Sequence, residues 1–195
     1  TWTATDECGN TATCVQTITV QDITAPVITC PADVVINCED PSTPAATGSA
    51  TATDNCDLAP VITFSDVTTP GSCVGNFVIA RTWTATDNCG NTSTCVQTIT
   101  VQDISAPVIT CPVDVVINCE DTSSPAVTGS ATATDNCDLA PVITFSDVTA
   151  PGSCAGNFVI VRTWTASDEC GNTATCVQTI TVQDITAPVI TCPVD

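Results

Sequence analysis

Cysteine is the residue type in this chain with the greatest capacity for chemistry. The sequence holds 15 cysteines in 195 residues. This density is typical of an oxidising, extracellular compartment, where disulfides supplement a small hydrophobic core. Thiolate metal binding is the alternative, but the chain has no histidine, and its closest cysteines, such as Cys89 and Cys95, lie six positions apart rather than in a zinc knuckle. The sequence therefore predicts structural disulfides.

Carboxylates are the second reactive group, and they restrict what the chain binds. There are 21 acidic residues against two basic ones, which gives a net charge of −19. Such a charge excludes nucleic acid and anionic membrane surfaces as natural partners. Without histidine, lysine or tyrosine, paired carboxylates are the main route left to acid–base catalysis. The sequence predicts that the protein is not an enzyme.

These residues recur with a period of 81. Trp2, Trp83 and Trp164 mark the period, and residues 1–81 differ from residues 82–162 at 10 positions, none of them a Cys, Trp, Arg or Asp. A fixed period of this length is typical of an array of small modules that each fold as a unit. We therefore expect function to lie in the length, stiffness and surface of the array.

The repeat also predicts the domain boundaries. Cutting at the run Gln-Asp-Ile-Thr/Ser-Ala-Pro gives complete modules at residues 22–102 and 103–183. We expect residues 1–21 to be the end of a preceding module and residues 184–195 the start of a following one. The chain would then be a window on a longer polymer, in which a missing signal peptide carries no information.

Each module has the pattern of an all-β sandwich. Val, Ile and Thr form short alternating runs separated by Pro, Gly, Asn and Asp, as is typical of sandwich strands. Alternation predicts that Trp83 and Ala85 point inward. Arg81, in phase with Trp83, is expected to cap its ring or to neutralise a carboxylate such as Asp66. The strands expected in the first complete module are 25–30, 33–38, 48–53, 60–66, 77–87 and 93–102.

Three short motifs carry a family resemblance. In the first complete module they are Cys30-Pro31, Asp87-x-x-Gly90-Asn91, and Cys95 followed by Ile99 and Val101. Together they resemble the hyalin repeat, an immunoglobulin-like module of extracellular adhesive proteins. The near-identical array also resembles the repeats of giant bacterial cell-surface adhesins, including those of gliding bacteria. The resemblance implies immunoglobulin-like sandwiches, and with the cysteine density, the self-repelling charge and the short linker we expect disulfide-stapled modules arranged head to tail as a rod. The hyalin pattern lacks four of the six cysteines found here.

Six cysteines per module allow 15 pairings, which the sandwich topology reduces. The first and last strands should begin at the same end, which places Cys30 beside Cys95, the pair that the hyalin resemblance also implies. The other four cysteines are expected in two pairs at opposite ends of the module. A hairpin-closing bond between Cys89 and Cys95 is the alternative and would require a different set. The expected bonds are Cys30–Cys95, Cys38–Cys73, Cys56–Cys89, Cys111–Cys176, Cys119–Cys154 and Cys137–Cys170.

The carboxylates cluster at the module ends and suggest a calcium site. Asp103 should lie between the acidic end of one module and that of the next. Calcium prefers such oxygen clusters, and calcium at linkers stiffens tandem sandwiches, as in cadherin-like arrays. The alternative is a set of solvated acidic loops that keep a long fibre soluble. The expected ligands are Asp103, Glu39, Asp40, Asp135, Asp138 and Asp168.

Two functions compete. Near-identical modules favour a stiff, disulfide-stabilised spacer in an extracellular filament or cell-surface adhesin, whose partners are the neighbouring modules of the same chain. The alternative is a binding module that recognises a glycan, a surface or ice through its acidic loops or its outward-facing threonines. Neither function involves nucleic acid or insertion into a membrane. The threonines expected to face outward are Thr82, Thr84, Thr86, Thr94, Thr98 and Thr100.

Overall fold

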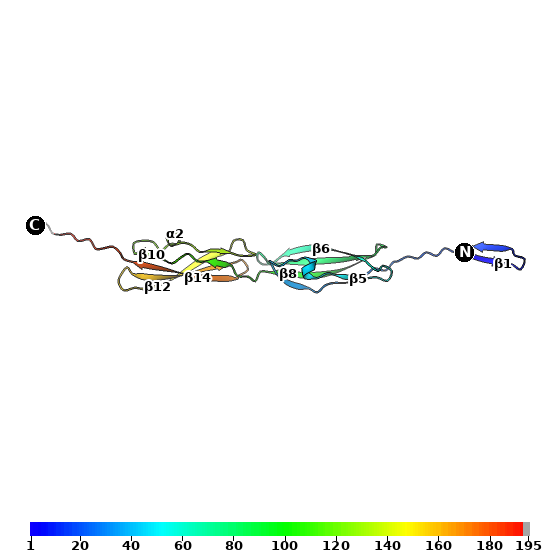
Figure 1. Cartoon of the computed structure of the whole chain (residues 1–195), viewed down its shortest axis with the longest axis horizontal. Coiled ribbons are helices and arrows are strands. Elements are labelled where there is room, and N and C mark those ends of the chain that lie inside the picture. Colours follow the sequence, from blue (N-terminus) through cyan, green and yellow to red (C-terminus); the bar gives the residue numbers. More distant parts are fainter. Residues whose placement is uncertain (193–195) are drawn as a thin grey trace. The chain divides into compact units, whose positions relative to one another are not determined.

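The computed structural model of the chain describes residues 1–192 and consists of β-sheets joined by loops (Figure 1). Among these residues the helices are two single turns, α1 (Pro44–Thr47) and α2 (Pro125–Thr128). The predicted all-β class is confirmed. No helix within the described part is long and apolar enough to cross a membrane. The last three positions of the predicted segment 184–195 lie outside the described residues.

Six strands recur with the 81-residue period. All six strands predicted for residues 22–102 are present, and the fourth continues four residues beyond Asp66. The first copy contains β3 (Val27–Thr29), β4 (Val34–Asn37), β5 (Thr51–Thr53), β6 (Val61–Pro70), β7 (Phe77–Thr86) and β8 (Thr92–Gln102). The second contains β9 (Val108–Thr110), β10 (Val115–Asn118), β11 (Thr132–Thr134), β12 (Val142–Pro151), β13 (Phe158–Ser167) and β14 (Thr173–Gln183). A hairpin of β1 (Trp2–Thr5) and β2 (Thr11–Cys14) precedes them.

The chain divides into two compact units. The first contains Thr1–Pro31, Ser49–Ser65 and Thr82–Gln97. The second contains Ala32–Gly48, Asp66–Arg81 and the chain from Thr98 onward. The whole second copy therefore belongs to the second unit, together with the segments of the first copy that contact it.

The second copy is a sandwich of two sheets. Its four-stranded sheet has the order β10-β14-β13-β12, in which β10 and β14 are parallel and the other pairs are antiparallel. Strands β9 and β11 form the second, antiparallel sheet. Cys111, directly after β9, is disulfide-bonded to Cys176 in β14, with 5.8 Å between their Cα atoms, so this bond ties one sheet to the other. The first copy has the corresponding orders β4-β8-β7-β6 and β3-β5.

The apolar core lies mainly on the inward faces of the two central strands of each four-stranded sheet. Side chains of β13 and β14 alternate between buried and more exposed positions, and those of β7 and β8 do the same. The inward direction predicted for Trp83 and Ala85 is confirmed. The core residues are Ile79, Trp83, Ala85, Ile99 and Val101 in the first copy, and Ile160, Trp164, Ala166, Ile180 and Val182 in the second.

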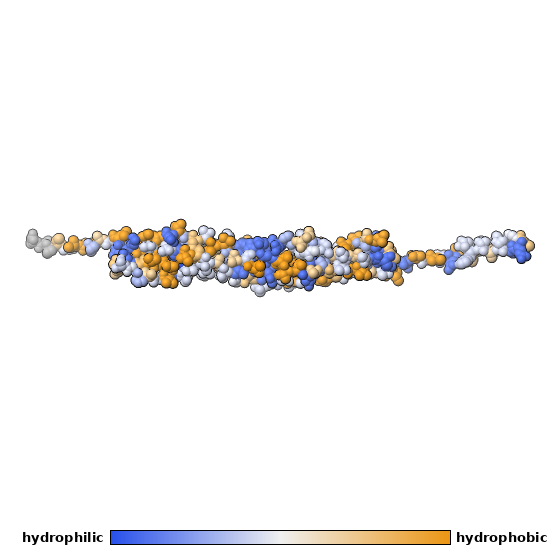
Figure 2. Space-filling model, turned by 60° about the horizontal axis from the view of Figure 1, so that its bottom comes forward, coloured by the Kyte–Doolittle hydropathy of each residue, from blue (hydrophilic) through white to orange (hydrophobic). Residues whose placement is uncertain are grey.

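Many apolar side chains remain on the surface. Figure 2 shows apolar (orange) areas alternating with hydrophilic (blue) ones. Val67 and Val148 on the outer strands are exposed, and Phe64 and Phe145 are about half exposed. A repeat of this size buries a smaller share of its surface than a larger domain does. Stability must therefore come partly from covalent bonds and buried polar contacts.

A buried arginine completes the core of the second copy. Arg162 is 2% exposed. Its Nε and Nη2 groups donate to the two carboxylate oxygens of Asp147, both at 2.8 Å, and Nη1 donates to Thr128 Oγ1 at 3.0 Å. The guanidinium carbon lies 4.3 Å from the centre of the Phe145 ring, within cation–π range. One side chain therefore joins the strands of the sheet to the α2 turn.

The first copy repeats this ion pair. Arg81 donates to both carboxylate oxygens of Asp66 at 2.8 Å, so the predicted role of Arg81 is confirmed. These hydrogen bonds outweigh the effect of partial burial and hold the pKa of Asp66 below its ordinary value, because they stabilise the ionised carboxylate.

Replacing Asp66 with alanine should destabilise the chain by about 3 kcal/mol at pH 7, because a buried guanidinium would lose its charge partner. The lowered pKa means that Asp66 contributes fully above about pH 4 and loses its contribution as the pH falls further. Denaturant unfolding followed by circular dichroism should therefore show a difference from wild type that shrinks in acid. Thr68→Ala, at an exposed position of the same strand, is the control and should change stability by less than about 0.5 kcal/mol. A pH-independent difference would contradict this role.

Candidate functional site at the repeat junction

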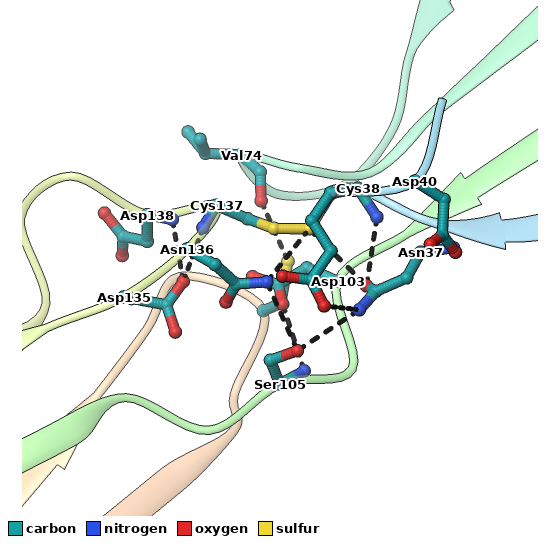
Figure 3. Close-up of a disulfide and its surroundings, with 12 residues drawn as sticks. Asn37, Cys38, Asp40, Val74, Asp103, Ser105, Asp135, Asn136, Cys137 and Asp138 are labelled. Carbon is teal, nitrogen blue, oxygen red and sulfur yellow. Dashed lines mark hydrogen bonds between the residues drawn. A yellow bond between two sulfur atoms is a disulfide. The ribbon is translucent and has the colours of Figure 1, made fainter. Parts of the chain in front are cut away.

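Four cysteines gather where the first copy contacts the second, and Figure 3 shows one of the two bonds, Cys38–Cys137, with its surroundings. Cys38 follows β4, and Cys73 lies in the loop between β6 and β7. Cys137 lies between β11 and β12, and Cys170 between β13 and β14. Cys38 is bonded to Cys137 and Cys73 to Cys170, with Cα–Cα distances of 6.2 Å and 5.2 Å in the usual range for disulfides. Two covalent bonds therefore connect the copies within the second unit.

These bonds correct part of the predicted pairing. Cys38–Cys73 and Cys137–Cys170 do not form, because the turns that carry these cysteines direct the sulfur atoms toward the other copy. The predicted pairs Cys56–Cys89 and Cys119–Cys154 are also wrong, since all four residues are free thiols in the described chain. The sandwich bonds have the expected partners, Cys30–Cys95 and Cys111–Cys176.

Three carboxylates accompany the junction disulfides. Asp103, Asp135 and Asp168 each offer one oxygen, and these oxygens all lie within 4.8 Å of one another. Asp103 follows β8 of the first copy, whereas the other two come from the loops that carry the second copy's junction cysteines. Each of these loops therefore supplies one carboxylate and one sulfur. We call the three carboxylates and the four bonded cysteines the junction cluster.

The sequence of the β13–β14 loop fixes its shape locally. Asp168 accepts hydrogen bonds from the backbone N–H and the Nδ2 group of Asn172, both at 2.8 Å. Gly171 has a φ of 91°, a conformation that glycine adopts without strain. Nδ2 of Asn172 also donates to the backbone carbonyl of Asp103 at 3.3 Å. The exposed β1–β2 loop has the same internal bonds to Asp6, so the loop forms without a neighbouring copy.

The β11–β12 loop uses a shorter turn. Oδ1 of Asp135 accepts the backbone N–H groups of Cys137 at 2.9 Å and Asp138 at 2.8 Å, which is an Asx turn. Nδ2 of Asn136 donates to Ser105 Oγ across the junction at 3.3 Å, as Figure 3 shows. The turn therefore holds Cys137 against the first copy while leaving the second oxygen of Asp135 unused.

The junction cluster contains buried carboxylate oxygens with unmet hydrogen-bonding capacity. In the described part of the chain, Oδ2 of Asp103 and Oδ2 of Asp135 are buried and have no hydrogen-bond partner. Asp103 is 5% exposed. Burial raises its pKa above the ordinary value against a hydrogen bond from Ser105 that lowers it, and the charges of Asp135 and Asp168 raise it further. Such an arrangement is costly unless a cation or a proton compensates it.

The structure brings together half of the calcium ligands expected from the sequence. Asp138 uses both oxygens to accept backbone N–H groups, at 2.9 Å and 3.0 Å. Glu39 and Asp40 accept hydrogen bonds from Asn37 in their own turn. These three residues therefore have other roles, and the set whose oxygens converge is Asp103, Asp135 and Asp168.

An equivalent carboxylate cluster lies 81 residues earlier, within the first unit. Asp22, Asp54 and Asp87 also offer oxygens within 4.8 Å of one another, and Oδ2 of Asp54 is buried without a partner among the described atoms. The loops that hold it carry the free cysteines Cys56 and Cys89. The site is thus a recurring feature of the repeat.

Comparison with known proteins supports the hyalin-like character of the repeat. No protein-family model matches the chain. Hyalin of Lytechinus variegatus is 33% identical over 207 residues, covering 98% of this chain and 38% of that protein. Hyalin of Strongylocentrotus purpuratus is 34% identical over 206 residues, covering 98% of this chain and 17% of that protein. The chain carries hyalin-repeat-like modules and spans well under half the length of these relatives.

Protocadherin extracellular domains are among the solved structures that match. The protocadherin gammaB4 extracellular domain is 13% identical with a TM-score of 0.36, covering 82% of this chain and 34% of that one. Protocadherin gamma C5 EC1-3 is 13% identical with a TM-score of 0.34, covering 81% and 68%. These TM-scores are below the level that indicates a shared fold. The disulfides themselves place the chain outside the cell, in an oxidising compartment.

Proposed function

We propose that this chain is a stiff spacer in a long extracellular filament or cell-surface adhesin, with a structural rather than an enzymatic role. The observation that carries the proposal is the pair of disulfides between the copies, Cys38–Cys137 and Cys73–Cys170. A tandem protein joined by its backbone alone can bend at every linker. Two further covalent connections restrict both bending and twisting, which is the property that a spacer needs.

The linker itself supports the same function. It is short, running from the end of β8 at Gln102 to the start of β9 at Val108. Pro107 fixes its own φ and biases Ala106 toward an extended form. The backbone N–H of Asp103 donates to Oδ1 of Asn76 at 2.6 Å, so the first linker residue is held by the β6–β7 loop. Little freedom remains between the two ends of the linker.

Calcium would strengthen the junction. Ca²⁺ takes six to eight oxygen ligands and favours carboxylates, and the junction cluster offers three from the two copies. Two of the oxygens are buried without a hydrogen-bond partner in the described chain, so an ion there would relieve an existing cost. A bound ion would draw Asp103 of one copy to Asp135 and Asp168 of the next.

Ligand recognition by the threonine-rich face is the second candidate. Thr165 lies directly opposite Thr175 in the β13–β14 pair, as a threonine ladder requires. The next outward threonine of β14, Thr179, lies opposite Val161, which interrupts the ladder. A glycan, a surface or ice would therefore meet a mixed face. The threonine ladder is interrupted, whereas both disulfides that the spacer function requires are formed. We therefore favour the spacer.

The variant Asp103→Asn tests whether calcium binds at the junction cluster. Because the pKa of Asp103 is raised in the folded chain, its ionised form costs stability at neutral pH, and this cost disappears in acid where the carboxyl is protonated. With a chelator at pH 7, the variant should melt about 2–4 °C above wild type, and the gap should close near pH 3. Millimolar calcium should then stabilise wild type more than the variant. The readout is calorimetric melting.

Glu39→Gln is the matched control for this experiment, because it removes the same charge from a residue outside the converging set. It should respond to calcium as wild type does. A calcium-induced shift of the same size in wild type and in Asp103→Asn would contradict calcium binding at the junction. The equivalent cluster around Asp22 remains intact in both chains, so the expected loss is partial.

Small-angle X-ray scattering tests the spacer function. Wild type should have an extended, narrow distance distribution, with roughly 35–45 Å per module from strands of about ten residues plus the linker. Replacing the four junction cysteines by serine should broaden and shorten the distribution, because bending is then opposed only by the linker and the non-covalent contacts. Cys8→Ser with Cys14→Ser is the control, since both residues lie outside the junction. A compact, folded-back wild type would contradict the proposal.

A further inference from the structure

Four free cysteines occupy positions equivalent to the junction cysteines. Cys56 and Cys89 correspond, 81 positions earlier, to the bonded Cys137 and Cys170. Cys119 and Cys154 correspond, 81 positions later, to the bonded Cys38 and Cys73. The free thiols are therefore divided into two pairs, and each pair matches one side of the junction described above.

The first pair is held in the geometry of its bonded counterpart. The backbone N–H of Cys56 donates to Oδ1 of Asp54 at 3.0 Å, as that of Cys137 does to Asp135 at 2.9 Å. Cys89 lies in the loop closed by Asp87, which accepts its backbone N–H at 2.9 Å. Both side chains are exposed. The side of a junction that corresponds to Cys56 and Cys89 therefore forms before a partner is present.

The second pair shows the same correspondence. The backbone N–H of Cys119 donates to Oδ1 of Asn118 and to the carbonyl of Gln183, both at 2.9 Å. Cys38 has the equivalent bonds within its copy, at 3.0 Å and 2.9 Å. The carbonyl of Cys154 accepts the N–H of Asn157 at 3.1 Å, as in the loop that carries Cys73. The side of a junction that corresponds to Cys119 and Cys154 is thus formed as well.

We propose that these two pairs are the unbonded halves of further junctions, and that their partner is another copy of the same repeat. Cys119 and Cys154 would bond the cysteines of a following copy that correspond to Cys137 and Cys170. Cys56 and Cys89 would bond the cysteines of a preceding copy that correspond to Cys38 and Cys73. Every junction in such an array carries two disulfides.

The proposal also accounts for the remaining free thiols. Cys14 corresponds to Cys95, and Cys192 corresponds to Cys111, so each is half of a sandwich disulfide. Cys8 corresponds to Cys89 and Cys170 and is half of a junction. All seven free cysteines therefore have an assigned type of partner. This assignment holds whether or not the array serves as a spacer.

Each junction bond is an ordinary oxidation of two thiols. One S–S bond forms, two S–H bonds break, and two protons and two electrons leave the pair. A small disulfide such as oxidised glutathione accepts them by thiol–disulfide exchange and becomes two thiols. The extracellular compartment supplies oxidants of this class.

The bonding pattern limits how far each repeat of the array can be extended under tension. Cys56 and Cys73 face opposite junctions and are only 17 residues apart, and Cys89 lies 14 residues before Asp103. At about 3.6 Å per extended residue, these covalent paths span at most about 60 Å and 50 Å. An unfolded repeat of 81 residues without them would span about 290 Å. A repeat stapled at both ends therefore cannot be drawn out far, even if its sandwich opens.

An extended chain tests the proposal. One additional copy of residues 103–183 is placed after Gln183 of the whole 195-residue chain, and the protein is folded in a glutathione redox buffer. Free thiols are alkylated, and pepsin digestion with mass spectrometry identifies the linked peptides, since two arginines and no lysine give trypsin too few cleavage sites. Thr122 and Ala155 distinguish the peptides of Cys119 and Cys154 from those of the first copy.

The expected result is two linkages that the 195-residue chain does not have. Cys119 should be joined to an Asp-Asn-Cys-Asp peptide and Cys154 to an Asp-Glu-Cys-Gly peptide, while the number of alkylated thiols stays at the seven of the original chain. Cys119→Ser in the extended chain should remove the first linkage, leave the second and release one thiol in the added copy. Recovery of Cys119 linked to Cys154 would overturn the proposal, and so would the absence of both new linkages with four more alkylated thiols than the original seven. A compact shape in scattering would refute the spacer function but leave these linkages unaffected.

Discussion

The small apolar core of each repeat is the constraint on which the other features depend. Each copy buries only a few large apolar side chains on two long strands, with Trp83 or Trp164 at the centre. A disulfide between the sheets restricts the unfolded chain and is typically worth 2–4 kcal/mol. The buried arginine, bonded to a carboxylate and to the α-turn, fills space that a larger domain would fill with apolar residues. Stability of the fold therefore comes largely from specific bonds.

Specific bonds also hold one copy to the next. Each of two short loops holds one carboxylate and one cysteine through Asx-type hydrogen bonds, so the shape of the loops fixes the positions of both groups. The disulfides bring Asp103 of the first copy against Asp135 and Asp168 of the second. This contact leaves buried carboxylate oxygens that a cation would satisfy. The junction disulfides and the converging carboxylates that we propose as a calcium site are thus two consequences of one local geometry.

Local pattern predicted most of the fold and part of the site. Alternation identified the strands and the inward Trp83, and phase identified the Arg81–Asp66 pair. Sandwich topology could not predict the junction pairing, because it concerns the contacts inside one module. The 81-residue period did indicate it, since head-to-tail copies place the end that carries Cys38 and Cys73 next to the end that carries Cys137 and Cys170. Gln178 was also missed: it is buried and donates to the carbonyls of Val113 and Thr128, contacts between segments far apart in sequence. The one indication of this role in the sequence was that Gln178 falls on the same alternating face of its strand as Cys176 and Ile180.

The central claim is that disulfides join one repeat to the next, and mapping the disulfides of the 195-residue chain tests it most directly. The chain is alkylated without reduction and digested with pepsin at low pH, where thiol exchange is suppressed because the thiolate is scarce. The account predicts that peptides of the first copy are linked to peptides of the second, Cys38 to Cys137 and Cys73 to Cys170. Recovery of Cys38 linked to Cys73, with Cys137 linked to Cys170, would contradict it.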